Sequence, residues 1–196
     1  MEYRLNKEDL LKTLAGWNGF LNKKVHLIAC GGTALTLLGI KPSTKDVDFI
    51  VPEPGEHKYL VGVLDQLGYK PVTGAGWKRE GEVYIFDLFK GKRVHTTELL
   101  QSPLRPEGHS LIKEFSHLYI GVLNPYDLIV SKLFRCSSVD VDDCLMLVRV
   151  RLKEIDVKVL AERFKETARF DISEDRMMLN WEHFLRVLKK EGLYGK

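Results

Sequence analysis

The sequence has few cysteines, no long apolar stretch and only a small excess of basic over acidic residues. Its 196 residues include three cysteines, an odd number with no Cys-x-x-Cys spacing. A disulfide framework is therefore not expected. A zinc site is not expected either, because no histidine lies near Cys136 or Cys144 in the sequence. The apolar runs at 25–28 and 34–40 are far shorter than the ~20 residues that cross a bilayer, so we expect no membrane partner. The first eight residues carry acids and no secretion-signal core, which predicts a cytoplasmic protein.

The overall composition is that of a folded globular protein. Thirty Lys and Arg against 27 Asp and Glu give a net charge of +3, which permits a polyanionic partner without requiring one. Hydrophobic residues make up 44% of the chain. A chain of this length can bury roughly 70% of its unfolded surface, so it needs neither a disulfide nor a metal to fold.

Hydrophobic spacing predicts a mixed α and β region followed by a helical one. Strands are expected at 25–30, 46–51, 83–89 and 118–123. Helices are expected at 8–21, 33–38, 56–67, 126–136, 140–149, 156–169 and 173–191. Residues 74–77 indicate a loop or hairpin entry, and 102–114 an irregular surface segment. We therefore predict an α+β fold with a mixed sheet flanked by helices, a core at 1–123 and a helical C-terminal part at 124–196 packed on it.

Three aspartates stand on predicted strands where carboxylates are costly. Asp46 and Asp48 project from one face of their strand, about 6–7 Å apart at a rise of ~3.3 Å per residue. Asp87 interrupts an otherwise apolar strand. Hard oxygen ligands suit Mg²⁺, and three carboxylates on neighbouring strands are typical of metal-assisted phosphoryl or nucleotidyl transfer. The alternatives are an exposed strand end for the Asp pair and, for Asp87, an ion pair with a nearby cation such as Lys90, Lys92 or Arg93.

Gly31 and Gly32 end the first strand and open a helix. Without β-carbons, a phosphate can approach their backbone, and the free N–H groups of a helix start favour an anion. Thr33 follows, where it can cap the helix or touch phosphate. The segment is neither a dinucleotide-binding fingerprint nor a P-loop, and the alternative is a simple turn.

The order of these features resembles the nucleotidyltransferase superfamily with the DNA polymerase beta fold. A Gly-Gly turn, a short spacer and a Asp-x-Asp strand are that superfamily's signature. Residues 31–35 (GGTAL) and 44–49 (TKDVDF) are most similar to the AbiEii-like and related uncharacterised prokaryotic members. The resemblance implies that Asp46, Asp48 and Asp87 bind Mg²⁺ or Mn²⁺ and take part in catalysis. It also implies that Gly31, Gly32, Thr33 and Lys45 contact the nucleotide.

A second segment, residues 124–135 (NPYDLIVSKLFR), resembles the lysine-bearing helix of the same family. Leu128, Lys132 and Arg135 share one helical face at spacings of four and three. By resemblance, Lys132 is a catalytic residue that points at the nucleotide phosphates together with Arg135, and Asp143 orients Lys132. The alternative for Lys132 is a solvated charge on a helix surface.

These features predict a nucleotidyltransferase that moves a nucleoside monophosphate from an NTP to an acceptor hydroxyl. Asp87 or Asp48 would help to activate that hydroxyl. The acceptor is a tRNA or other RNA, a protein or a small molecule, and the resemblance extends to toxins of toxin–antitoxin pairs, whose protein partner is an antitoxin. The alternative is a non-catalytic nucleotide-binding or protein-interaction module on the same fold, with the helical part as its interface.

Overall fold

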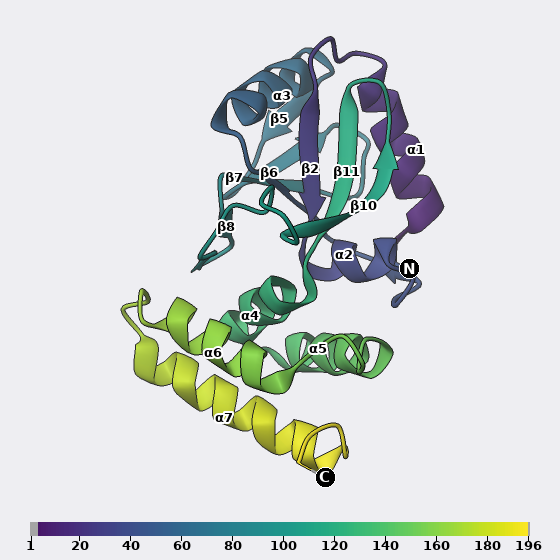
Figure 1. Cartoon of the computed structure of the whole chain (residues 1–196). Helices are drawn as coiled ribbons and strands as arrows, with labels where there is room; N and C mark the ends of the chain where they lie inside the picture. Colours follow the sequence, from purple (N-terminus) through teal and green to yellow (C-terminus); the bar gives the residue numbers. More distant parts are fainter. Residues whose placement is uncertain (1–3, 196) are drawn as a thin grey trace. The chain divides into compact units, whose positions relative to one another are not determined.

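The computed structural model describes residues 4–195 and divides into two compact units (Figure 1). The sheet unit comprises residues 4–94 and 101–124, and the helical unit comprises 95–100 and 125–195. The segment 95–100 therefore belongs with the C-terminal helices, although it lies inside the predicted core in the sequence. The order of residues along the chain does not reveal this assignment, because the assignment depends on contacts between residues far apart in the sequence.

A seven-stranded mixed sheet forms the body of the sheet unit. Its strands, in spatial order, are β10 (His109–Glu114), β11 (Leu118–Leu123), β2 (Val25–Ala29), β4 (Val47–Val51), β7 (Phe86–Lys90), β6 (Gly76–Arg79) and β5 (Tyr69–Pro71). The pairs β11–β2 and β4–β7 are parallel, and the other neighbours are antiparallel. β2, β4 and β11 are almost wholly buried, which explains their continuous apolar runs.

Three helices belong to this unit: α1 (Lys7–Asn18), α2 (Gly31–Leu37) and α3 (Pro54–Gln66) (Figure 1). Asn6 caps the N-terminus of α1, and its side chain accepts a hydrogen bond from the Asp9 amide. It buries Trp17 against Tyr69 and Phe86, with ring centroids 5.6 Å and 4.4 Å away. Two short strands, β1 (Leu5–Asn6) and β3 (Ser43–Thr44), pair as a separate antiparallel ribbon. The short strand β8 (Arg93–Val94) also belongs to this unit, whereas β9 (Thr97–Glu98) belongs to the helical unit.

The sheet contains strands that the sequence did not predict. β10 lies within the segment expected to be irregular, and β5 and β6 form a hairpin where only a hairpin entry was expected. β10 is an edge strand whose residues are exposed or half-buried and whose register shifts between Leu111 and Lys113. Because one face is solvated and the ladder is interrupted, the strand lacks a clear apolar alternation, and only its pairing with buried β11 defines it.

The helical unit contains α4 (Pro125–Arg135), α5 (Ser138–Val150), α6 (Val157–Ala168) and α7 (Glu174–Lys190) (Figure 1). α4 touches the three other helices, and every residue from 127 to 134 is buried. Phe134, Phe164, Trp181 and Phe184 form a continuous aromatic core with centroid separations of 5.4, 5.3 and 6.2 Å. The apolar residues of α7 therefore stabilise the helical unit itself. None of the helices formed by residues 4–195 has the length and apolar character of a membrane span.

Candidate active site

The register of the sheet places two of the three predicted acids opposite each other. β4 and β7 run parallel, and Asp48 is the Cα partner of Asp87. Directly paired residues of neighbouring strands project to the same face, so the two carboxylates share one side of the sheet. Asp48 is only 5% exposed, and Asp87 is half-buried. Two acids distant in sequence thus become direct neighbours.

Asp46 lies on the exposed bend that precedes β4, outside the ladder of the sheet. Burial raises the pKa of Asp87, and the negative charge of Asp46 raises it further. The negative charge of Asp46 thus disfavours the ionised form of Asp87, in the same direction as burial. All three acids lie in the sheet unit, in a region where a positive charge would relieve their mutual repulsion.

The two glycines make room for the aspartate segment. Gly31 has φ +57°, and a β-carbon on it would overlap Asp48 Oδ2. A β-carbon on Gly32 would lie 2.8 Å from Thr44 Oγ1. The missing side chains therefore let the start of α2 pack directly against Asp48 and Thr44. This close approach to carboxylate and hydroxyl is an additional reason for the Gly-Gly pair, beside the phosphate approach that the sequence predicted.

Thr33, on α2, is buried between that helix and the Asp-x-Asp segment. Its side chain is 0% exposed. Its hydroxyl donates to the Asp46 carbonyl oxygen at 3.0 Å and accepts from the Asp48 amide at 2.9 Å. Thr33 thus links α2 to both residues of the Asp-x-Asp segment, and its contact with a nucleotide stays a prediction. Lys45, by contrast, is exposed.

The carboxylates suit a divalent cation in their chemistry. Asp48 and Asp87 are paired hard oxygen donors, of the kind that Mg²⁺ prefers. A β-carbon on Gly31 would overlap the Asp48 carboxylate, so this glycine keeps room for that donor. Within residues 4–195, no three Asp, Glu, His or Cys side chains are assembled as a ready metal cluster. The donor set therefore fits the expected ion, whereas the third ligand has to come from Asp46 on its bend, from the nucleotide or from water.

A second cluster of predicted site residues lies in the helical unit, between α4 and α5. Lys132 is 3% exposed, and its Nζ donates to Asp143 Oδ2 at 2.7 Å. Asp140 Oδ1 lies 3.6 Å from the same nitrogen. The predicted contact between Lys132 and Asp143 is present, and the alternative of a solvated lysine is wrong. Its role toward a nucleotide stays a prediction.

Arg135 completes this cluster through Asp140. An Arg135 guanidinium nitrogen donates to Asp140 Oδ1 at 2.6 Å, and the Ser137 hydroxyl donates to Asp140 Oδ2 at 2.8 Å. Ser137 and Asp140 also form the capping box of α5. Burial opposes ionisation of Asp140, but the hydrogen bonds from Arg135 and Ser137 outweigh it and lower its pKa. Asp140 is therefore ionised at neutral pH, with Arg135 and Lys132 as its neighbouring basic side chains.

His95 faces the same cluster from the 95–100 segment. Burial lowers its pKa to about 4, Arg135 and Lys132 lower it as well, and Asp140 opposes them. Between pH 6.5 and 4 the unfolded chain therefore binds a proton that the folded chain does not, so stability should fall as the pH drops through this window. The residue has φ +50°, a conformation that asparagine tolerates.

Replacing His95 with asparagine should therefore weaken the acid sensitivity of the fold. We expect wild type to lose about 1–2 kcal/mol more unfolding free energy than His95→Asn between pH 7 and pH 4.5, after allowance for solvent screening. Urea unfolding at several pH values measures this difference, and the variant corrects for all other titrating groups. Parallel pH profiles for the two proteins would contradict the assigned pKa.

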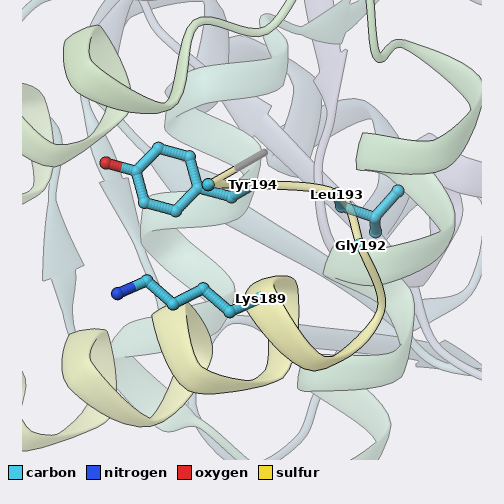
Figure 2. Close-up of a pocket in the computed structure, with 5 residues that line it drawn as sticks. Lys189, Gly192, Leu193 and Tyr194 are labelled. Atoms are coloured by element: carbon cyan, nitrogen blue, oxygen red, sulfur yellow. The ribbon is translucent and has the colours of Figure 1, made fainter.

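A pocket lies elsewhere, at the end of the helical unit (Figure 2). It is lined by Lys189, Gly192, Leu193, Tyr194 and Gly195. These residues belong to the last turn of α7 and the segment that follows it, and they include none of the predicted site residues. None of these five described residues has a carboxylate side chain, so they lack the donors expected of a metal-assisted transfer.

Two further residues at these sites, Thr44 and His95, were not among the predicted site residues. Thr44 is buried, and its hydroxyl donates to the Asp46 carbonyl oxygen at 2.8 Å. Its position two residues before Asp46 is a signal in the sequence, since a threonine hydroxyl can bond the backbone two residues on. His95 carries no such signal, because its neighbours Lys132, Arg135 and Asp140 lie far along the chain.

Comparisons with known proteins found a family model and similar solved structures. Residues 18–189 match the model of a family described as "Nucleotidyltransferase of unknown function" (DUF6036). The chain is similar in structure to ANT(2")-Ia in complex with adenylyl-2"-tobramycin, with a TM-score of 0.56 at 14% identity, covering 80% of this chain and 95% of that one. It also matches an antigenic nucleotidyltransferase-like protein from Paracoccidioides brasiliensis, with a TM-score of 0.47 at 13% identity, covering 90% and 95%. No curated protein matches the sequence.

These comparisons confirm the predicted fold class. The similarity to ANT(2")-Ia, together with the mixed sheet and its flanking helices, supports the α+β nucleotidyltransferase fold. The family match covers both units of the chain. The assignment to the AbiEii-like branch stays a prediction.

Proposed function

The chain belongs to a family of nucleotidyltransferases of unknown function, and on that premise we propose that it transfers a nucleoside monophosphate from an NTP to a hydroxyl acceptor with the help of a divalent cation. The acceptor oxygen attacks the α-phosphorus, the bond from that phosphorus to the bridging oxygen breaks, and pyrophosphate leaves. The observation that carries the proposal is the pairing of Asp48 with Asp87 beside the side-chain-free start of α2.

In the sheet unit, three carboxylates would bind the metal ion. Asp48, Asp87 and Asp46 would hold Mg²⁺ or Mn²⁺, which when bound neutralises phosphate charge and lowers the pKa of a bound hydroxyl. Asp87 or Asp48 would accept the proton of the acceptor hydroxyl. We expect the backbone N–H groups of Gly31 and Gly32, at the start of α2, to bind phosphate oxygens, and exposed Lys45 adds positive charge next to Asp46.

In the helical unit, Lys132 and Arg135 would supply the positive charge for the nucleotide phosphates. Asp143 orients Lys132 through its 2.7 Å bond, and Asp140 holds Arg135 at 2.6 Å. Fixed cations cost little reorganisation when charge develops on the leaving pyrophosphate, which favours the reaction. This role rests on the resemblance of the α4 segment to the lysine-bearing helix of the superfamily.

The acceptor supplies a hydroxyl group, and its class follows from the relatives only by analogy. The solved complex of ANT(2")-Ia contains an adenylylated small molecule, which makes a small-molecule acceptor one candidate. Hydroxyl groups of RNA and of proteins are the other candidate acceptors. If the protein is the toxin of a toxin–antitoxin pair, its acceptor is one of these two.

Calorimetric titration with each NTP, with and without Mg²⁺, tests the proposal. We expect wild type to bind at least one NTP only when Mg²⁺ is present. Asp48→Asn keeps the shape of the side chain and removes its charge, so this binding should disappear while circular dichroism stays unchanged. Asp65→Asn, at an exposed carboxylate in the same unit, is the matched control and should bind like wild type.

The outcomes separate the enzyme from its alternative. Binding that needs no Mg²⁺ and survives Asp48→Asn would favour a non-catalytic nucleotide-binding module. A wild-type chain that binds no NTP under either condition would reject the proposed substrate.

A further inference from the structure

The backbone of Asp46 lies outside the ladder of the sheet. The residue lies on an exposed bend, so no strand partner fixes its backbone. A carboxylate that has to meet a metal ion needs a defined position, because small displacements weaken coordination strongly. The backbone of Asp46 must therefore be held by something other than the sheet.

Two buried threonine hydroxyls converge on the Asp46 carbonyl oxygen. Thr44 Oγ1 donates to it at 2.8 Å and Thr33 Oγ1 at 3.0 Å. Both lone pairs of the carbonyl are thereby used, and both donors are shielded from water, with exposed fractions of 6% and 0%. The pair of hydroxyls replaces the ladder bonds that a strand residue would have.

Other parts of the sheet unit hold Thr44 in place. Thr44 belongs to β3, and its Cα partner in the β1–β3 ribbon is Leu5, which is 1% exposed. Gly32 leaves the space that the Thr44 hydroxyl occupies, since a β-carbon there would lie 2.8 Å from Oγ1. The N-terminal ribbon, the Gly-Gly turn and the bend at Asp46 thus meet at one hydroxyl.

We propose that Thr44 is a positioning residue for the metal-binding carboxylates, and that its hydroxyl sets the place of Asp46 relative to Asp48. The inference rests on the proposed function, because it assumes that these carboxylates bind a divalent cation. Thr33 takes part in the same arrangement, but its hydroxyl also satisfies the buried Asp48 amide. Removal of Thr33 would therefore disturb the fold as well, whereas the Thr44 hydroxyl donates to the Asp46 carbonyl oxygen.

The test is a titration with Mn²⁺ in the presence of an NTP. Electron paramagnetic resonance measures the concentration of free Mn²⁺ at each step. Thr44→Val removes the hydroxyl with little change in volume, and we expect it to weaken Mn²⁺ binding about tenfold to a hundredfold, the usual range for groups that orient metal ligands. Thr44→Ser keeps the hydroxyl and should recover most of the affinity. Thr44→Ala, which is smaller and cannot overpack, should behave like Thr44→Val.

Thr36→Val is the matched control. Thr36 is a buried threonine on α2 whose hydroxyl donates to the Gly32 carbonyl at 3.1 Å, so the change is chemically the same. Its Mn²⁺ affinity should equal that of wild type. Equal Mn²⁺ affinities for Thr44→Val and Thr36→Val would overturn the inference. So would unfolding of both Thr44→Val and Thr44→Ala at 25 °C, since the hydroxyl would then be required by the fold rather than by the site.

Failure of the proposed function has a different signature. In that case wild type itself would bind no Mn²⁺ with any NTP, and the Thr44 variants would not differ from it. Loss of binding confined to the hydroxyl-free Thr44 variants supports both the site and its positioning residue.

Discussion

Gly31→Ala is expected to weaken Mg²⁺-dependent NTP binding by about a hundredfold or more, because the new methyl group displaces the carboxylate of Asp48. Gly31 has φ +57°, and a β-carbon at this position overlaps Asp48 Oδ2. Calorimetric titration of the variant with the NTP that wild type binds measures the loss. Circular dichroism and thermal unfolding establish that the variant is folded.

Gly39→Ala is the control for the backbone. Gly39 has φ +74°, so alanine is strained there as well, by about 1–2 kcal/mol, but nothing lies within 4 Å of the new β-carbon. Both variants should lose some stability, and only Gly31→Ala should lose NTP binding. Equal affinities for the two would mean that the approach of Gly31 to Asp48 is unimportant for the site.

Lys132→Met is expected to lower the unfolding free energy by about 3–5 kcal/mol in the absence of nucleotide. The substitution removes the buried cation that lies 2.7 Å from Asp143 and 3.6 Å from Asp140, and it leaves their negative charge in the interior. Urea unfolding at neutral pH measures the change. The double variant Lys132→Met/Asp143→Leu should recover much of it, because an apolar pair no longer buries an uncompensated charge.

The exposed ion pair between Lys70 and Asp65 provides a matched control. Its length is also 2.7 Å, but its side chains are 68% and 57% exposed. Lys70→Met should cost less than about 1 kcal/mol, since water already solvates both charges. A similarly small effect of Lys132→Met would show that burial adds nothing to the Lys132 interaction.

Local patterns in the sequence were sufficient for much of the fold. Continuous apolar runs identified β2, β4 and β11, because strands buried on both faces have no polar residues to interrupt them. Helical spacing identified α4 to α7, whose apolar faces pack on one another. The edge strand β10 was missed, because its exposed residues have no apolar pattern and its identity depends on a distant partner.

The sequence by itself determined the residue types of the candidate site: a Gly-Gly turn, an Asp-x-Asp segment, a later Asp and a helical lysine. Spacing along the chain carries this information because the elements that bear these residues are local. Tertiary structure alone decided that Asp48 faces Asp87, that Thr33 and Thr44 hold Asp46, and that Lys132 is buried against Asp143. Each of these contacts depends on strand register or helix packing, which long-range burial sets and which no single segment encodes.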